Sequence, residues 1–383
     1  MGFFDDDEIS ATVKGCGDCQ IQHKVHCKDF CGLINPRARI LIVDEHPWSS
    51  QIEADDWDAG SHASWLLKTL RECGINHGNA SFVHAKRCCH SDYSEQCVSR
   101  LINDIVTLKP RVVMLCGDQS IQAIIGKKFP SLCATSIVQG YVIPEQEYKC
   151  FVVPNYGSKH FDIIGRNPAI DTLFRKNANK CLEYSRREFT PYTPIDCRVV
   201  SSIDDVSRYL ARARKEIVAI DFETTGLKPH RKGHKVLTVG LGFADVAVAF
   251  VVTDDNKAMI ADYLACSSPK LIYNLSFECL WAKVFFGVTI NNIVADVMLQ
   301  AHLLDGKTGI LSLDKQVYLH FGLASWDAFD REKASCEQGH GANSFNRLEA
   351  VVKHGDVHSL LKYNAMDCAA TMMLYQKFSG LGL

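Results

Sequence analysis

Residues 217–227 read IVAIDFETTGL, and this stretch decides how the second half of the chain is expected to fold. The apolar, β-branched run before Asp221 predicts a buried strand, and the Thr-Thr-Gly after it predicts a turn. Side chains two apart on a strand point to the same face, so Asp221 and Glu223 project together where the strand ends. Crowded carboxylates repel each other unless a divalent cation lies between them, and oxygen ligands favour Mg²⁺ or Mn²⁺. Alone, such a pair is more often a solvated strand end than a functional site.

Composition sets the class of protein. The chain has 383 residues, enough for two domains, and its 47% hydrophobic and 22% charged residues are ordinary for globular proteins. A formal charge of −2 excludes overall attraction to nucleic acid, so such a partner would need local basic groups or metal. Acidic residues 5–8 argue against a secretory signal, and no run approaches the ~20 apolar residues of a membrane span. We expect no membrane partner and a cytoplasmic location, in a bacterium or a phage-infected cell.

A charged segment with two prolines, residues 185–196, predicts a boundary. We expect a first domain over 1–186, a linker over 187–196 and a second domain over 197–383. In the first domain, apolar strands alternate with amphipathic helices, which predicts a parallel α/β sheet. The strands are expected at 39–43, 81–84, 111–116 and 150–153, and the helices at 61–72, 94–108 and 119–125. In the second, a hairpin-like mixed sheet is expected at 217–222, 236–243 and 246–252, with helices at 201–215, 277–286, 296–304, 311–321 and 357–378.

Further acidic residues follow in the second domain. Glu278 lies in the first turn of one predicted helix, and Asp296 stands where the next should begin. In the last long helix Tyr363 and Asp367 are four residues apart, so they lie on one helical face.

These segments, in this order, resemble the DEDD superfamily of 3′–5′ exonucleases, in its tyrosine-bearing subgroup, and most closely the proofreading domain of family A DNA polymerases. The resemblance covers about residues 197–383 and implies a ribonuclease H-like α/β fold with a mixed sheet. Residues 221–224 match the first motif, 274–278 the second and 363–367 the third, while Asp296 matches a less directly catalytic acid. The catalytic residues it implies are Asp221, Glu223, Glu278, Tyr363 and Asp367.

The chemistry accounts for these residue types. Two metal ions roughly 3.5–4 Å apart can activate water and neutralise the charge of a phosphodiester transition state. We expect Asp221, Glu223 and Asp367 to bind two Mg²⁺ or Mn²⁺ ions and Tyr363 to orient the water, more than to act as a base with its pKa near ~10. Glu278 departs from the family's Asp by a methylene, about 1.5 Å of reach. An active site with a lengthened ligand, a slow enzyme and an inactive relic all remain open.

Seventeen cysteines are present, and many lie near the N-terminus. In a reducing compartment such clustering favours metal binding over disulfides. The pattern begins with C-x-x-C at Cys16 and Cys19, and its spacing excludes neither zinc nor an iron–sulfur cluster. The other cysteines of this N-terminal group are Cys27, Cys31, Cys73, Cys88, Cys89 and Cys97.

Residues 14–185 resemble the family 4-like, iron–sulfur uracil-DNA glycosylases. The resemblance rests on the cysteines, on the strand and acidic loop at 39–48, on the helix from Gly60 and on a core strand at 109–117. It implies a 4Fe–4S cluster held by Cys16, Cys19, Cys88 and Cys97, with Cys89 as a substitute for Cys88. A zinc site of Cys16, Cys19, Cys27 and Cys31, or buried free thiols, are the alternatives.

The departures from that family fall on its chemistry. Glu45 keeps the acidic position, but Asp44 and Trp48 replace loop glycines that let the backbone approach a flipped base. Val83 or His84 stands where the uracil-reading Asn is expected, and residues 156–158 lack the loop histidine. We therefore expect glycosylase activity to be lost, leaving a structural or DNA-positioning module.

A glycosylase-like domain before a proofreading-like exonuclease resembles the front half of certain phage-type family A polymerases. We expect a metal-dependent 3′–5′ exodeoxyribonuclease that acts on single-stranded or frayed DNA 3′ ends, proofreads during replication and partners a DNA polymerase. The chain ends after the exonuclease, so we expect a subunit of a split polymerase or a piece of a longer one. The alternatives are an RNA exonuclease of the ribonuclease D type and a nucleic-acid-binding or polymerase-docking module whose catalytic residues have drifted.

Overall fold

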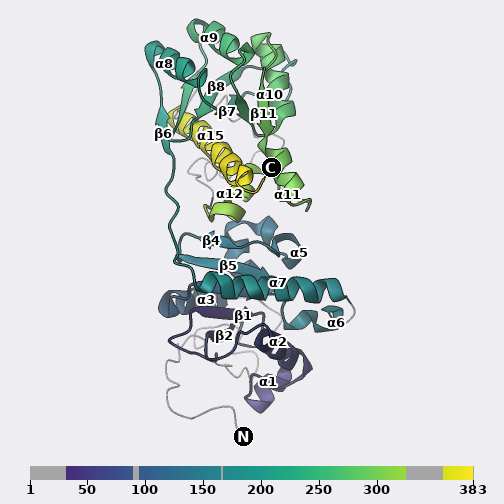
Figure 1. Ribbon diagram of the computed structural model, residues 1–383. Helices are drawn as coiled ribbons and strands as arrows, with labels where there is room; N and C mark the ends of the chain where they lie inside the picture. Colours follow the sequence, from purple (N-terminus) through teal and green to yellow (C-terminus); the bar gives the residue numbers. More distant parts are fainter. Residues whose placement is uncertain (1–31, 89–94, 165–166, 325–356, 383) are drawn as a thin grey trace. The chain divides into compact units, whose positions relative to one another are not determined.

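The computed structural model describes residues 32–88, 95–164, 167–324 and 357–382, which form two units that each contain a β-sheet (Figure 1). The first unit comprises Met1–Tyr192 with Tyr318–Leu323, and the second Thr193–Val317 with Ala324–Leu383. Among the helices described, none combines the length and apolar character that crossing a membrane requires. The two units are α/β in class, as expected.

The sheet of the first unit has the order β2-β1-β3-β5-β4. Strands β1 (Ile40–Asp44), β2 (Ala80–His84), β3 (Val112–Cys116) and β5 (Cys150–Asn155) are parallel, and β4 (Ile143–Glu145) pairs antiparallel with β5. Every residue of β1, β2 and β3 is buried, as is typical of a parallel sheet covered on both faces. The parallel sheet is confirmed. Strand β4 was not predicted, because three residues are too few to show a strand pattern.

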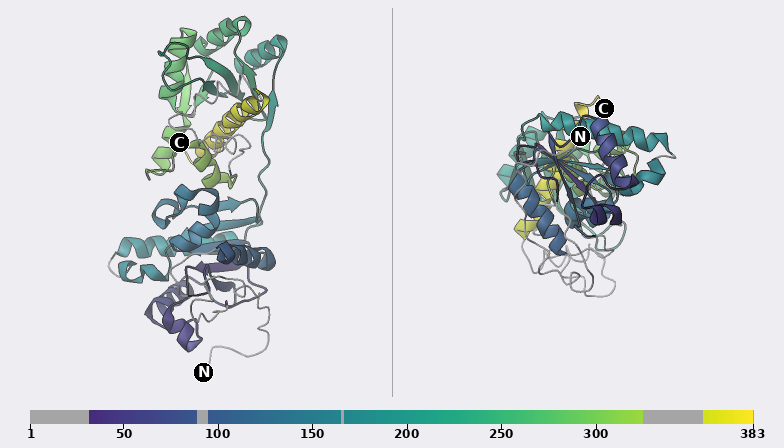
Figure 2. Two further views of the ribbon diagram at one scale, coloured as in Figure 1. Left: turned by 180° about the vertical axis from the view of Figure 1, so that it is seen from behind. Right: turned by 90° about the horizontal axis from the view of Figure 1, so that it is seen from below.

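Helices α2 and α7 cover one face of this sheet. Leu66 and Leu70 of α2 and Phe174 of α7 pack with Ile42 and Met114. Helix α7 contacts β1, β3 and β5 and lies along the sheet (Figure 2). The helices of this unit are α1 (Ser49–Ala54), α2 (Ser61–Glu72), α3 (Glu95–Leu108), α4 (Asp118–Ile121), α5 (Thr135–Val138), α6 (Phe161–Ile164) and α7 (Pro168–Ser185).

The sheet of the second unit has the order β11-β10-β7-β8-β9-β6. Strands β7 (Val218–Thr224), β8 (Val236–Gly242) and β9 (Val246–Val251) are successively antiparallel. Strands β10 (Lys270–Ile272) and β11 (Ile293–Asp296) continue parallel to β7, and β6 (Asp196–Val199) pairs parallel with β9. An antiparallel meander extended by parallel strands beside its first strand is the ribonuclease H-like arrangement. The predicted hairpin series is confirmed, whereas the three short strands were missed.

Helices cover both faces of this second sheet. On one face, Leu210 of α8, Ile260 of α9 and Trp281 of α10 pack with Ile220 and Phe222. On the other, α15 contacts β6, β7, β8 and β9. The helices of this unit are α8 (Ile203–Ala213), α9 (Asp254–Ala265), α10 (Leu275–Trp281), α11 (Val297–Leu304) and α15 (Val357–Ser379). Helix α12 (Leu313–Phe321) begins in this unit and its residues from Tyr318 onward belong to the first.

Close approach of α15 to β8 depends on two glycines. A Cβ atom at Gly240 would lie 2.5 Å from Cys368 Sγ, and one at Gly242 would lie 2.4 Å from the carbonyl oxygen of Cys368. Real Cβ atoms do not approach other atoms this closely, so only glycine allows the helix to lie at this depth. The helix thereby carries Asp367 to the strand that bears Asp221.

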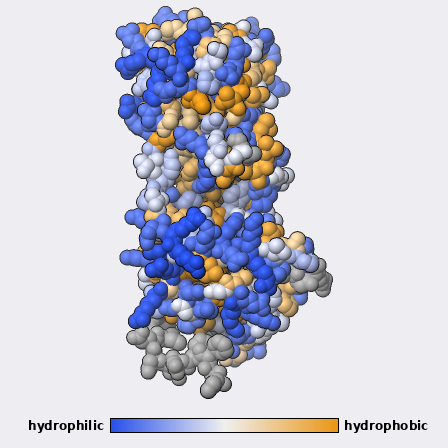
Figure 3. Space-filling view, in the orientation of Figure 1, coloured by the Kyte–Doolittle hydropathy of each residue, from blue (hydrophilic) through white to orange (hydrophobic). Residues whose placement is uncertain are grey.

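Helix α11 buries only one narrow side. Val297 and Ala301 are buried, while Leu299 and Leu303 are 54% and 74% exposed. Apolar surface is visible on this face of the second unit around the position of α11 (Figure 3). Some of the apolar side chains of α11 therefore lie at the surface and not in the core.

Candidate functional site

Three carboxylates from two elements meet in the second unit. Asp221 and Glu223 come from β7 and Asp367 from α15, and one ligand oxygen from each lies within 4.8 Å of the others. All three side chains are half-buried. Strand periodicity explains why the first two face the same way, and α15 supplies the third. An all-oxygen donor set at this spacing fits Mg²⁺ or Mn²⁺.

Asp221 has a perturbed pKa. Burial raises the pKa of its carboxyl to about 6, although a hydrogen bond from Asn364 opposes the shift. A raised pKa means that the ionised form lacks compensating positive charge in the protein itself. A bound divalent cation would supply that charge.

Glu278 lies beside this group and not in it. Its side chain is only 2% exposed, and it accepts a hydrogen bond from the backbone N–H of Phe222. Burial, followed by repulsion from Asp221, raises the pKa of Glu278 well above its usual value. Its Oε2 atom is buried without a hydrogen-bond partner. Glu278 is therefore a buried carboxyl next to Asp221 that takes up a proton more readily than an exposed glutamate.

The other two predicted residues have distinct surroundings. Tyr363 is half-buried on α15, one turn before Asp367. Asp296 caps α11: its Oδ1 accepts from Met298 N at 3.0 Å, and its Oδ2 accepts from Leu275 N at 3.0 Å. The Asp296 carboxylate thus links the first turn of α10 to the first turn of α11 and stabilises both helix starts.

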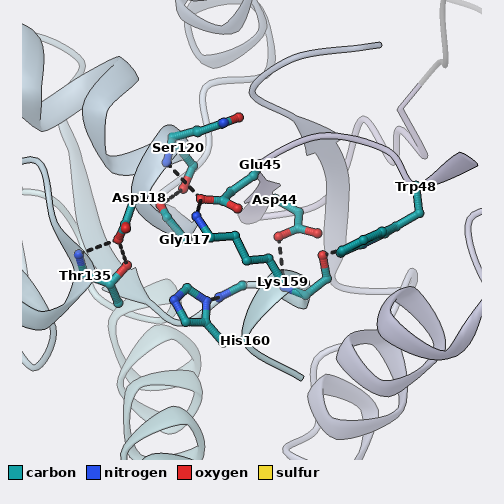
Figure 4. Close-up of polar contacts among 12 residues, drawn as sticks. Asp44, Glu45, Trp48, Gly117, Asp118, Ser120, Thr135, Lys159 and His160 are labelled. Atoms are coloured by element: carbon teal, nitrogen blue, oxygen red, sulfur yellow. Dashed lines mark hydrogen bonds and ion pairs between the residues drawn. The ribbon is translucent and has the colours of Figure 1, made fainter. Parts of the chain in front are cut away.

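The first unit contains a second polar cluster, around the acidic loop after β1 (Figure 4). Glu45 is 2% exposed, and its Oε1 accepts from Gln119 N at 3.0 Å and pairs with Lys159 Nζ at 3.2 Å. Asp44 Oδ1 accepts from Ser158 N at 3.2 Å. The two acids of the β1 loop are therefore tied to the loop that follows β5.

The positions of the expected loop glycines are filled. Trp48 stacks on His62 with ring centroids 4.1 Å apart, and its Nε1 donates to Ser158 Oγ at 2.9 Å. A Cβ atom at Gly157 would lie 2.6 Å from the carbonyl oxygen of Cys116 and 2.7 Å from Asp44 Oδ1. Only glycine fits at position 157 in this backbone, and Tyr156 stands where the family's histidine is expected.

His84 occupies the end of β2. It is buried, stacks on Trp57 with centroids 4.1 Å apart, and burial lowers its pKa well below the usual value. His84 is therefore held as a neutral ring in the core.

Asp44 gives the first unit a pH-dependent stability. Burial raises its pKa to about 7, so its stabilising contribution is complete below about pH 4 and is lost as the pH rises through about 7. We expect Asp44→Asn to keep the acceptor for Ser158 N while removing this loss. The unfolding free energy of Asp44→Asn minus that of the wild type should therefore be larger at pH 8.5 than at pH 5, by roughly 2–3 kcal/mol.

Urea unfolding at both pH values measures this effect, with exposed Glu53→Gln as the matched control. An equal gain or loss at the two pH values would show that Asp44 titrates normally.

The cysteine predictions fall mainly outside the described residues. Cys16, Cys19, Cys27, Cys31 and Cys89 lie there. Cys88 is half-buried after β2, and Cys97 is buried in α3. The cluster and its ligands stay a prediction.

Comparisons with known proteins give distant similarities. No protein-family model matches the chain. In its N-terminal region the chain is 25% identical over 124 residues to the type-4 uracil-DNA glycosylase of Pyrobaculum aerophilum. That match covers 30% of this chain and 63% of the glycosylase, so the chain spans less than two thirds of that relative.

Solved structures that are similar to about half of the chain include the following two. One is Brucella melitensis NrnC with bound Mg²⁺, at 16% identity and a TM-score of 0.35, covering 49% of this chain and 81% of that one. The other is the catalytic core of RRP6 from Trypanosoma brucei, at 14% identity and a TM-score of 0.37, covering 50% of this chain and 49% of that one. Both units are α/β, the first has a distant resemblance to a glycosylase, and the sheet topology of the second is ribonuclease H-like.

Proposed function

We propose that the second unit is a metal-dependent 3′–5′ exonuclease. The observation that carries this proposal is the convergence of Asp221, Glu223 and Asp367 at one site of a ribonuclease H-like sheet. Tyr363 lies one turn from Asp367 on the same helix, which supports its assignment to the same site.

Each residue has a distinct task in this proposal. Asp221, Glu223 and Asp367 would hold Mg²⁺ or Mn²⁺, and the ion would supply charge neutralisation and a more acidic water. The Tyr363 hydroxyl would orient the attacking water. Glu278, buried beside Asp221, stays among the proposed catalytic residues and would also support the strand at Phe222.

DNA is the proposed substrate class. The nuclease unit shares its chain with a unit similar to a uracil-DNA glycosylase, which favours a DNA context. On this basis we also propose that the activity proofreads replication in partnership with a DNA polymerase. The charge of −2 gives no long-range attraction, so the 3′ end would be bound by local contacts and metal.

A substrate series tests the function. We expect the full chain with Mg²⁺ or Mn²⁺ to shorten a 3′-labelled mismatched DNA primer and single-stranded DNA one nucleotide at a time, and to act more slowly on RNA of the same sequence. Faster cleavage of RNA would replace this proposal with the ribonuclease D-type function. If the protein binds the DNA and the RNA but removes the 3′ label from neither, the second unit is a binding module.

For the first unit we propose a positioning module that retains a 4Fe–4S cluster on Cys16, Cys19, Cys88 and Cys97 but does not excise uracil. The Glu45–Lys159 ion pair and the Trp48–Ser158 hydrogen bond occupy the loops that would have to face a flipped base. We expect anaerobic protein to be brown and uracil-containing DNA to stay intact. A colourless protein containing zinc, or release of uracil, would contradict the respective part.

A further inference from the structure

Asn364 is a fully buried amide directly beside the three-carboxylate group. Its exposed fraction is 0%, and it lies on α15 between Tyr363 and Asp367. Its Nδ2 donates to Asp221 Oδ2 at 2.6 Å and lies 3.3 Å from the carbonyl oxygen of Asp221. One buried amide thus binds both the side chain and the backbone of a predicted ligand.

The hydrogen-bonding partners fix the orientation of this amide. Both Asp221 atoms can only accept when the carboxyl is ionised, so the Asn364 nitrogen must face them. Its Oδ1 then faces Thr238 Oγ1 at 3.0 Å, and the hydroxyl must be the donor. Thr238 is 1% exposed and lies opposite Glu223 in the β7–β8 register. These two hydrogen bonds link Thr238 of β8 to Asn364 of α15 and Asn364 to Asp221 of β7, and we call this chain of three residues the relay.

A glycine provides the space for this relay. Gly240 lies opposite Asp221 in the register, and a Cβ atom there would lie 2.9 Å from the carbonyl oxygen of Asn364 and 3.1 Å from its Cγ. The amide is therefore enclosed by strand β8 on one side and by Asp221 on another. An enclosed side chain with fixed partners has little freedom to rotate.

We propose that Asn364 is a positioning residue for Asp221 and that Thr238 acts through Asn364. The inference rests on the proposed function for the use of the cation. The amide holds one oxygen of the Asp221 carboxylate in place, and the other oxygen would be available to Mg²⁺ or Mn²⁺. Partners of this kind, which orient a ligand without touching the metal, typically contribute 10–100-fold to metal affinity or activity.

Mn²⁺ affinity of the full chain, measured by calorimetry without nucleic acid, tests the relay. Asn364→Ala should weaken Mn²⁺ binding by about 10–100-fold. Thr238→Val should produce a smaller loss, and Thr238→Ser, which keeps the hydroxyl, should restore the affinity. Because Thr238 acts through Asn364, the Asn364→Ala/Thr238→Val double variant should bind no more weakly than Asn364→Ala alone.

Asn256→Ala is the matched control. Asn256 is another buried amide of this unit, but it caps α9 and bonds to the backbone of Val251, so its loss should lower stability and leave Mn²⁺ affinity unchanged. If Asn364→Ala does not fold, comparison of Thr238→Val with Thr238→Ser still tests the relay. Only the serine variant keeps a hydroxyl that can donate to Asn364 Oδ1.

The results separate the two proposals. Wild-type protein that binds Mn²⁺ but cleaves no 3′ end would defeat the exonuclease, while the affinities would still judge the relay. The relay is overturned by wild-type protein that binds no Mn²⁺, by unchanged affinity in Asn364→Ala or Thr238→Val, or by an equal loss in Asn256→Ala.

Discussion

Asp221→Asn is expected to reduce the release of 3′-terminal nucleotides by about 10³-fold or more, equivalent to ~4 kcal/mol of transition-state stabilisation. The substitution keeps the size of the side chain and removes its charge. Asp221 is one of three carboxylates whose ligand oxygens lie within 4.8 Å, so the loss reduces both the charge and the number of ligands available to a cation. The rate should be measured as single-turnover cleavage of a 3′-labelled primer at saturating Mg²⁺. Asp367→Asn should give a loss of similar size.

The control for this prediction is Asp262→Asn. Asp262 belongs to the same unit, but its side chain is 76% exposed and is paired with Arg214. Its substitution should leave the rate within about twofold, since exposed ion pairs contribute little. Chelation of metal should reproduce the loss in the wild type, and added Mn²⁺ should reverse it. An Asp221→Asn protein that keeps the wild-type rate would place the chemistry elsewhere.

Gly242→Ala is expected to destabilise the second unit by about 3 kcal/mol, because overpacking of this kind costs 1–3 kcal/mol and sometimes more. The new Cβ atom would lie 2.4 Å from the carbonyl oxygen of Cys368, a backbone atom that cannot rotate away. Helix α15 would have to shift from β8 and carry Asp367 away from Asp221. Urea unfolding of the full chain, followed by fluorescence, measures the stability, and Mn²⁺ affinity should fall with it.

Gly306→Ala is the matched control, because a Cβ atom there would meet nothing nearer than His302 Cε1 at 4.0 Å. It should leave the unfolding midpoint almost unchanged, since it adds a methyl group in open space. If Gly242→Ala unfolds at the same urea concentration as Gly306→Ala, then α15 does not lie at the depth described.

Most regular elements could be predicted from local pattern. The apolar runs at 217–222, 236–243 and 246–252 predicted the β7–β8–β9 meander. The long C-terminal helix, expected at 357–378, was predicted close to its observed bounds, Val357–Ser379. Strands β10 and β6 were missed because three or four residues carry too little pattern. Helix α7 was missed although Asn167 and Pro168 mark its start, with the Asn167 side chain accepting from Ala169 N.

Two features of the site depended on information that no local pattern holds. Glu278 was predicted with the catalytic residues, and only the tertiary structure shows that its carboxyl is buried beside Asp221; its catalytic role stays a prediction. Asn364 was overlooked. The available signal was an amide beside Tyr363 in a helix otherwise rich in small and apolar residues, where a polar side chain needs a partner.

Sequence by itself determined which residue types could form the site. Strand periodicity placed Asp221 and Glu223 on one face, and helical periodicity placed Tyr363 and Asp367 on another, because both periods are properties of the backbone. Only the tertiary structure decided that the two faces meet. That meeting depends on the depth at which α15 lies on β8, which Gly240 and Gly242 set by the absence of side chains.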